Sequence, residues 1–304
     1  MPNIIEVKNF TKKFGDFTAV DNISFNVEEG IIFAFLGPNG AGKSTTINTL
    51  CTITDKTKGE LKINGHDVST HKSKVRSEIG IVFQESTLDG KLSVEENLQF
   101  HCVFYKVPKN EIKARINFAL DLVDLLDWGK APVNSLSGGM KRRVEIAKGL
   151  VHYPKVLFLD EPTTGLDPHT RSNIWNYIYK LQKDKNITIF LTTHYMDEAE
   201  ICDKVAIMDH GQIVAFDTPY NLKGQYTSNT TKIKTTEETK MHRYLQAQDI
   251  KYEVSDGVFT IYSSEVKPTI DLMTEFRASI TDFETAKGTL NDVFLAITGK
   301  EIRE

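Results

Sequence analysis

Residues 31–45 read IIFAFLGPNGAGKST and decide the fold of the chain. The first six residues are apolar, which is typical of a buried β-strand, and GPNGAGKST follows them directly. This second part fits the pattern GxxxxGK[ST], in which glycines let backbone N–H groups converge on phosphate oxygens at the start of a helix. We therefore predict a strand, a phosphate-binding loop and a helix that runs to about Cys51.

The loop predicts a nucleotide site with a magnesium ion. Lys43 is expected to neutralise the charge of the β- and γ-phosphates, and Ser44 is expected to ligate Mg²⁺. The residues expected to cradle the nucleotide are Gly37, Pro38, Asn39, Gly40, Ala41, Gly42, Lys43, Ser44 and Thr45.

Three further apolar runs have the length of buried strands: GIVF (80–83), VLFL (156–159) and ITIFLTT (187–193). They alternate with helical stretches, a rhythm that indicates a largely parallel sheet covered by helices. Short antiparallel strands are predicted over residues 4–27. The stretch of about 90–150 is mainly helical, and we interpret it as an inserted helical subdomain.

Each of these three runs is followed by polar residues. Gln84 follows the first run, Asp160 and Glu161 follow the second, and His194 follows the third. Any one of them alone would more often be structural. Because the carboxyl ends of parallel strands meet at the ligand crevice of an open sheet, we expect all four side chains to converge beside the phosphate loop.

The converging residues indicate hydrolysis of the terminal phosphate. Asp160 is expected to hold Mg²⁺ through water, and Glu161 to orient and polarise the attacking water. Gln84 would reach the ion and the water, and His194 would contact the γ-phosphate. The predicted metal ligands are thus Ser44, Gln84 and Asp160.

A second helix start suited to an anion lies in NSLSGGMKRRVEIAKGL, residues 134–150. Ser137, Gly138 and Gly139 offer a hydroxyl and bare N–H groups, which suits a γ-phosphate. The phosphates of the nucleotide bound by the same chain are already enclosed by the first loop. We therefore expect this segment to close over a nucleotide held by another subunit.

The rest of that helix carries both apolar and charged residues. Met140, Val144, Ala147 and Val151 form an apolar stripe. The charged residues off that stripe are predicted to form a solvated face, with Lys141 paired to Glu145. They are Lys141, Arg142, Glu145 and Lys148.

Composition narrows the class of protein. The 304 residues are 40% hydrophobic and carry a net charge of −4, which argues against a protein that coats nucleic acid. Cys51, Cys102 and Cys202 are far apart and are expected to be reduced thiols packed in a core. No signal peptide or run of about 20 apolar residues is apparent, so we expect a soluble chain whose membrane role, if any, runs through a partner.

The character of the chain changes after Gly224. A Thr-, Ser- and Lys-rich stretch over 225–240 reads as a linker, with a strand starting inside it. The segments that follow are predicted in the order βαββαβ, with strands at 231–235, 251–255, 258–262 and 280–285, helices at 237–248 and 267–277, and a final helix in TLNDVFLAIT. This order matches a small ferredoxin-like α+β domain. The predicted domains are 1–224 and 225–304.

Together, GPNGAGKST, LSGGM, LFLDEP, GLD and TTH resemble the ATP-binding cassette (ABC) family, over residues 4–224. The resemblance implies an α/β fold: a P-loop NTPase (RecA-like) core with an antiparallel β subdomain and a helical insertion. It also implies two cassettes that bind head-to-tail around two ATP. Ser137 and Gly139 would then touch the partner's γ-phosphate, and Asp167 would link the two sites.

Two positions depart from the usual family pattern. Met140 stands where glutamine is usual, and Phe14 stands where an adenine-stacking tyrosine is usual. The backbone groups and the ring face remain, so neither change removes a necessary group. Sequence alone leaves Phe14 with two interpretations: stacking on adenine, or packing in the core of the small sheet.

Met140, TTGLDP and the ending TLNDVFLAITGKEIRE resemble the daunorubicin-resistance-type exporter branch. The implied protein is the ATPase subunit of an exporter at the cytoplasmic face of the membrane, with ATP and Mg²⁺ bound. Its implied partners are a second cassette, identical or different, and separately encoded membrane permease subunits, with no nucleic acid. One alternative is a cassette ATPase that acts on ribosomes or DNA. Another is an unrelated P-loop kinase or GTPase, which the LSGGM segment and His194 disfavour.

Overall fold

The computed structural model describes residues 2–263 and 266–299, and the chain divides into two compact units, 1–216 and 217–302. The predicted boundary at 224/225 is therefore displaced, because it falls inside α8 (Pro219–Tyr226), which packs on the last helix, α11 (Leu290–Thr298). Parts of the predicted 225–304 domain and of its quoted ending, namely 264–265 and 300–304, lie outside the described residues.

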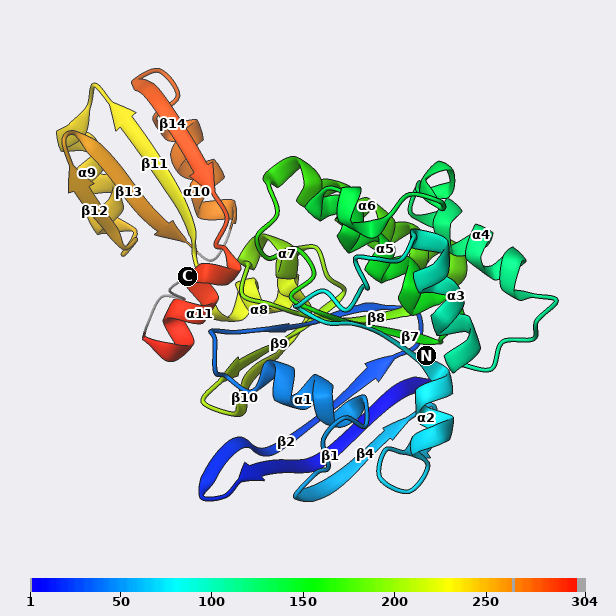
Figure 1. Cartoon of the computed structure of the whole chain (residues 1–304). Coiled ribbons are helices and arrows are strands. Elements are labelled where there is room, and N and C mark those ends of the chain that lie inside the picture. The colour runs from blue at the N-terminus through cyan, green and yellow to red at the C-terminus, as the bar shows by residue number, and fades with distance from the viewer. Residues whose placement is uncertain (1, 264–265, 300–304) are drawn as a thin grey trace. The chain divides into compact units, whose positions relative to one another are not determined.

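A six-stranded sheet forms the core of the first unit (Figure 1). Its strands lie in the order β10 (Gln212–Asp217), β9 (Lys204–Asp209), β3 (Ile32–Leu36), β8 (Thr188–Thr193), β7 (Val156–Asp160) and β6 (Ile79–Val82). The pairs from β9 through β3, β8 and β7 to β6 are all parallel, as predicted from the buried runs. Strands β9 and β10 were not predicted.

Helices cover both faces of this sheet. α1 (Lys43–Leu50) lies on one face, and α5 (Gly138–Leu150) and α6 (Pro168–Lys185) lie on the other (Figure 1). Two shorter helices flank the strands, α2 (Lys72–Glu78) and α7 (Met196–Glu200). The predicted helical insertion consists of α3 (Val94–Phe104), α4 (Ile112–Leu122), the 3₁₀ turns η1 (Leu126–Trp128) and η2 (Val133–Ser135), and α5, with α3, α4 and α5 packed on one another.

The predicted antiparallel strands form a second sheet. Its order is β2 (Phe17–Glu28), β1 (Asn3–Phe14), β4 (Lys58–Ile63) and β5 (His66–Asp67). Phe25 of β2 stacks on Phe33 of β3 with ring centroids 5.7 Å apart, so the two sheets share one apolar core. The three cysteines are buried free thiols, as expected.

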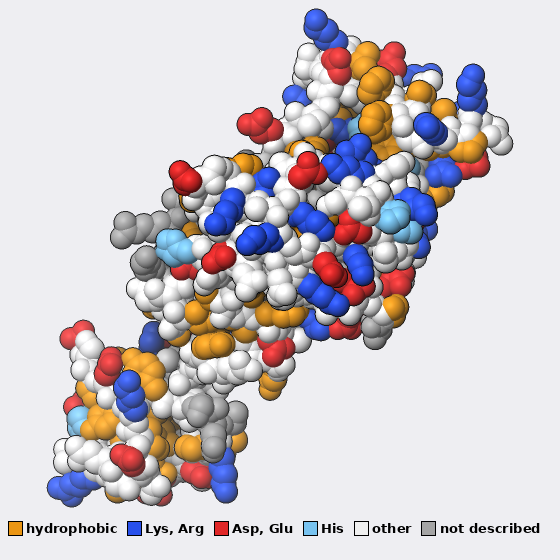
Figure 2. Space-filling view, turned by 90° about the horizontal axis from the view of Figure 1, so that it is seen from below, with side chains coloured by type: hydrophobic (Ala, Val, Ile, Leu, Met, Phe, Trp, Pro, Cys, Tyr) orange, Lys and Arg blue, Asp and Glu red, His pale blue; other side chains and the backbone are white. Residues whose placement is uncertain are grey.

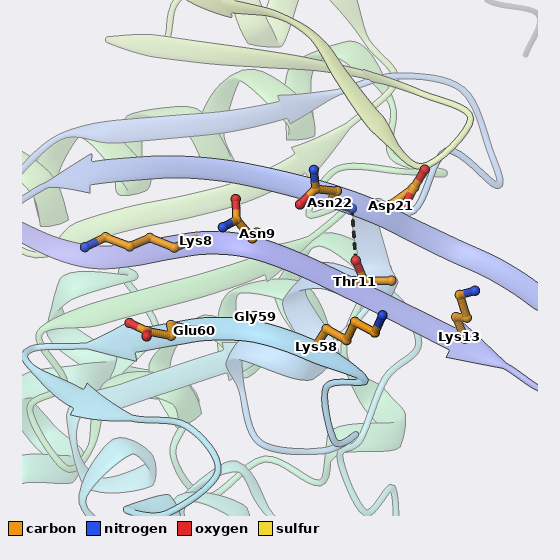
Figure 3. Close-up of a pocket in the computed structure, with 9 residues that line it drawn as sticks. All are labelled: Lys8, Asn9, Thr11, Lys13, Asp21, Asn22, Lys58, Gly59 and Glu60. Atoms are coloured by element: carbon orange, nitrogen blue, oxygen red, sulfur yellow. Dashed lines mark hydrogen bonds between the residues drawn. The ribbon is translucent and has the colours of Figure 1, made fainter.

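A hollow of about 700 Å³ lies on the antiparallel sheet (Figure 3). It is lined by Lys8, Asn9, Thr11, Lys13, Asp21, Asn22, Lys58, Gly59 and Glu60. The register of β1 and β2 shifts here, and Asn9 and Asn22 both have φ of 50°. Because none of its lining residues belongs to the predicted nucleotide site, we attribute the hollow to the irregular strands.

The second unit contains its own sheet. It comprises β11 (Asn229–Thr235), α9 (Glu238–Ala247), β12 (Tyr252–Ser255), β13 (Val258–Ser263), α10 (Val266–Glu275) and β14 (Ile280–Ala286), besides α8 and α11. The predicted βαββαβ order is confirmed. The strands lie in the order β12-β13-β11-β14, and all neighbouring pairs are antiparallel. Only a short connection separates α8 from β11, so most of the predicted linker is structured.

Within the described ranges, no helix combines the length and the apolar character needed to cross a bilayer.

Two partly buried histidines lie in and beside the helical insertion, His101 on α3 and His152 just after α5. The ring of His152 stacks on Tyr105 with centroids 3.8 Å apart, and its Nε2 lies 2.8 Å from the carbonyl oxygen of Ile79. Burial lowers the pKa of His152 to about 4. Burial, helped by Lys148 and His152, lowers the pKa of His101 to about 4 as well. Both side chains are therefore neutral in the folded protein at neutral pH.

These pKa values predict loss of stability in mild acid. Below pH of about 6.5 the unfolded chain binds protons on both histidines, whereas the folded chain does so only near pH 4. We expect the free energy of unfolding to fall as the pH drops through this window, measured by urea titration and circular dichroism. His152→Phe keeps a ring on Tyr105 and should show a shallower pH dependence. An unchanged slope in that variant would contradict the assignment.

Candidate nucleotide site

The phosphate loop is built as a close turn between β3 and α1. Gly42 caps α1 with φ of 101°, and a Cβ there would lie 2.6 Å from the carbonyl oxygen of Ala19, so only glycine fits. Lys43 is 4% exposed, and its Nζ donates to the carbonyl oxygens of Gly37 at 2.7 Å and Pro38 at 3.1 Å. Burial lowers the pKa of Lys43, and the Glu161 and Asp160 carboxylates oppose that effect. The ammonium group is thus held inside the loop.

The hydroxyl of Ser44 meets the end of β7. Ser44 Oγ donates to Asp160 Oδ1 at 3.0 Å, and Thr192 Oγ1 donates to the same oxygen at 2.5 Å. Thr192 stands opposite Asp160 in the pairing of β7 with β8. The sheet register therefore fixes the carboxylate of Asp160 against the start of α1.

The four predicted strand ends converge on the carboxylate of Glu161. Glu161 is 8% exposed, and Lys43 Nζ lies 3.7 Å from its Oε1. Gln84 Nε2 donates to Oε2 at 3.3 Å, and Thr164 Oγ1 donates to it at 3.2 Å. His194 Nδ1 lies 3.4 Å from Oε1 but is not aligned for a hydrogen bond. The structure brings the predicted residues together, while their individual roles remain predictions.

The predicted metal ligands fit a hard cation. Ser44 offers a hydroxyl oxygen, Asp160 a carboxylate and Gln84 a side-chain amide, all oxygen donors of the kind that Mg²⁺ prefers. The 3.0 Å contact between Ser44 and Asp160 already places two of these groups side by side.

The second predicted anion site caps α5. Ser137 is the N-cap, and its Oγ accepts from Met140 N at 3.2 Å. Ser137 and Gly138 are exposed, and nothing lies within 4 Å of the position that a Cβ of Gly138 would take. This helix start therefore faces outward with room for a ligand or a second chain.

Asp167 lies at the start of α6, the helix whose Thr170 approaches Gly139. It caps α6 by accepting from Thr170 N at 3.0 Å, and hydrogen bonding from Thr170 holds the pKa of Asp167 below its usual value. A Cβ on Gly139 would lie 2.5 Å from Cγ2 of the same Thr170. Thr170 thus connects two of the residues that the family resemblance assigns to the dimer interface.

Phe14 lies at the turn between β1 and β2 and is 50% exposed. The interpretation of Phe14 as a core aromatic is therefore wrong. Lys12 Nζ sits 4.6 Å from the ring centroid. The half-exposed ring leaves adenine stacking as the prediction.

The predicted solvated face of α5 is wrong. Arg142, Glu145 and Lys148 are all buried, and Glu145 pairs with Lys148 at 2.8 Å instead of with Lys141. Burial alone would raise the pKa of Glu145, but Lys148 and hydrogen bonds from Thr87 and Ser86 hold it below its usual value.

The reason for this burial is the close approach of α5 to β6. A Cβ on Gly80 would lie 2.2 Å from the carbonyl oxygen of Gly149. Helix and strand can pack so closely only with glycine at position 80. Gly80 and Gly149 were therefore the sequence signal of this packing, and an analysis of helical periodicity does not use it. The charged side chains are consequently enclosed. Glu145 and Lys148 bond to the loop after Gln84.

Arg142 is the site residue that sequence reasoning missed. Its guanidinium donates to backbone carbonyl oxygens at the ends of β6 and β7, next to Gln84 and Glu161. The carbonyl groups that bond to a buried arginine are brought to it only by the fold. No local sequence pattern could therefore indicate this role.

A glycine-rich loop around a buried lysine, beside strand ends that carry Asp160 and Glu161, defines a P-loop nucleoside triphosphatase. The sequence model of the ABC transporter family matches residues 20–164.

Relatives extend this match. The chain is 39% identical over 235 residues to the probable multidrug ABC transporter ATP-binding protein YbhF of Escherichia coli, covering 77% of this chain but only 40% of that protein's length. It is 35% identical to the Nod factor export ATP-binding protein I of Ralstonia nicotianae, over 99% of this chain and 95% of the relative. It is 31% identical to the daunorubicin resistance ATP-binding protein DrrA3 of Streptomyces coeruleorubidus, over 98% and 97%. The chain belongs to the ATP-binding cassette family of transporter ATPases.

Solved structures agree with this assignment. The chain resembles cbiO1 of Clostridium perfringens, part of the ABC transporter complex cbiONQ, with a TM-score of 0.68, 31% identity, and coverage of 82% of this chain and 96% of that one. It also resembles the cassette MJ0796 in a dimeric post-hydrolysis state bound to ADP and Pi, with a TM-score of 0.64, 28% identity, and coverage of 70% and 98%. Family and fold therefore agree.

Proposed function

We propose that the chain is the ATP-hydrolysing subunit of an exporter, working at the cytoplasmic face of a membrane with separately encoded membrane subunits. The observation that carries the catalytic part is the Glu161 carboxylate, which lies 3.7 Å from Lys43 and 3.3 Å from Gln84. The relatives named for drug resistance and Nod factor export support the exporter part.

The residues of the site divide the work of phosphoryl transfer. Lys43 and the loop amides would bind the β- and γ-phosphates, and Glu161 would accept a proton from the attacking water while Gln84 and His194 orient water and phosphate. Mg²⁺ held by Ser44, Asp160 and Gln84 would neutralise phosphate charge. Most of the acceleration would come from positioning and electrostatics.

The active form would be a head-to-tail dimer with two ATP at its interface, built from identical or different cassettes. The dimeric structure of the similar cassette MJ0796 supports dimerisation. The outward-facing start of α5 supports the further step, in which Ser137 and Gly139 contact the partner's γ-phosphate and Asp167 links the two sites.

Exposed apolar side chains on the helical insertion suit a membrane subunit. Phe100, Val103 and Phe104 follow the spacing i, i+3, i+4 on α3, and Phe104 is 67% exposed. Such a patch on a surface that otherwise mixes charges is typical of a protein interface. We propose that this face of α3 docks the membrane partner.

Phe104→Asp tests the docking proposal. The charge would be buried without a partner at the interface, so we expect the variant to retain the ATPase activity of the isolated chain but to lose most of the integral membrane protein that co-purifies from detergent-solubilised cells. Ile270→Asp, at a similarly exposed site in the second unit, serves as the control. Co-purification of wild-type chain with ribosomes or DNA, and not with a membrane protein, would contradict the exporter assignment.

A cassette ATPase that acts on DNA or ribosomes is the weaker candidate. The net charge is −4, and on the face seen in Figure 2 basic and acidic side chains are mixed. Nucleic-acid binding would require a basic surface.

For the second unit we propose a ferredoxin-like domain that reinforces or regulates the dimer. Its support is the βαββαβ order combined with the sheet order β12-β13-β11-β14. We place its start at residue 217 because α8 packs with α11.

A further inference from the structure

Arg142 links α5 to the ends of two strands of the catalytic sheet. The side chain is 8% exposed, and its guanidinium donates to four backbone carbonyl oxygens. They belong to Phe83 at 2.5 Å, Pro162 at 2.6 Å, and Asp160 and Glu161 both at 3.2 Å. A guanidinium carries five N–H donors in a fixed fork, so these bonds hold the four carbonyls in a single arrangement.

The peptide that carries the catalytic carboxylate needs such support. Glu161 has φ of 46°, in the left-handed region that residues other than glycine seldom adopt. Its N–H donates to the carbonyl oxygen of Thr192 at 3.2 Å and to Thr192 Oγ1 at 3.0 Å, while its carbonyl accepts from Arg142. A strained backbone persists where its surroundings over-determine it, and here Thr192 and Arg142 do so from opposite sides of one residue.

The same helix begins at the segment that faces outward. Gly138 is the first residue of α5 and Arg142 the fifth, so they are separated by about 6 Å along the axis. Ser137 and Gly138 are exposed at the helix start. Arg142 donates to the carbonyl oxygens of Phe83, which precedes Gln84, and of Glu161. One rigid turn of helix therefore connects the start of α5 with two groups of the chain's own catalytic site.

We propose that Arg142 is a positioning residue that couples the two nucleotide sites of the dimer. When the start of α5 closes on the γ-phosphate bound by the partner, Arg142 sets Glu161 and Gln84 of its own chain in the arrangement that hydrolyses ATP. The inference rests on the dimer of the proposed function. It differs from a purely structural brace because it acts on turnover through Glu161 and leaves nucleotide binding alone.

Arg142→Gln and Arg142→Lys test this role, with Arg143→Gln as the matched control on the same helix. Arg143 donates to the carbonyl oxygen of Val123 at 3.0 Å and to Tyr177 Oη at 3.1 Å, away from the strand ends. In Arg142→Gln we expect an unchanged Kd for ATP, since Lys43 and its loop are intact, and a kcat lower by on the order of 100-fold. Arg142→Lys keeps the charge without the fork and should recover part of the loss.

A double-variant cycle separates positioning from bracing. If Arg142 acts through Glu161, the cost of Arg142→Gln should vanish when single-turnover hydrolysis is measured in a Glu161→Gln background. An equal fractional loss in both backgrounds, or wild-type kcat in folded Arg142→Gln and Arg142→Lys chains, would overturn the inference. If Arg142→Gln does not fold, the same double-variant cycle is measured with Arg142→Lys. A wild-type chain without ATP-dependent dimerisation would instead overturn the proposed function, and the inference with it.

Discussion

Glu161→Gln is expected to bind ATP and to lose turnover by about 10²–10⁴-fold, the usual contribution of a general base. The amide fills the same volume but cannot accept a proton from water. It also removes a negative charge that lies 3.7 Å from Lys43 and faces the expected γ-phosphate, so ATP affinity should be kept or improved. With hydrolysis blocked, ATP should hold the chain as a dimer, visible as earlier elution in size-exclusion chromatography.

Glu85→Gln supplies the control for this prediction. Glu85 is exposed on the loop after β6 and next to Gln84 in sequence, yet no hydrogen bond of its carboxylate to the site is observed among the described residues. Its removal should leave turnover and elution as in the wild-type chain. Near-wild-type ATPase activity in Glu161→Gln would show that another group activates the water.

The convergence of Gln84, Asp160, Glu161 and His194 could be predicted because it needs only two inferences. Buried apolar runs indicate parallel strands, and the residue after each run then lies at the same edge. The phosphate loop adds its own signal through the spacing of its glycines and Lys43. Long-range order follows here from local patterns that agree with one another.

Arg142 illustrates what such patterns leave out. Its bonds reach carbonyl oxygens 18 to 59 residues away along the chain, and every residue type offers the same carbonyl. Periodicity placed it with Lys141 on a solvated face, because charged residues off an apolar stripe usually are solvated. The close packing of α5 on β6 overrides that rule. The predicted domain boundary was displaced for a similar reason. Helix α8 packs on α11, a helix more than sixty residues later in the chain.

Gly138→Asp should leave ATP binding by one subunit nearly intact and abolish both dimer closure and hydrolysis. The isolated chain tolerates the change, because nothing lies within 4 Å of the new Cβ and an acidic residue in the first turn suits the helix dipole. In the dimer the carboxylate would face the partner's γ-phosphate. Two like charges 4 Å apart repel by about 4 kcal/mol at an effective dielectric of 20.

Complementation in trans tests whose nucleotide this segment serves. Lys43→Ala leaves the phosphates of its own site without their cation, so each single variant should be inactive. A mixed dimer has one site with the intact Lys43 loop of the Gly138→Asp chain and the intact Ser137–Gly139 segment of the Lys43→Ala chain. Mixing the Gly138→Asp and Lys43→Ala chains should therefore restore ATPase activity, unless hydrolysis at one site requires hydrolysis at the other. If Gly138→Asp alone abolishes ATP binding by the monomer, measured by isothermal titration, the segment serves its own chain's nucleotide and the two-subunit site is wrong.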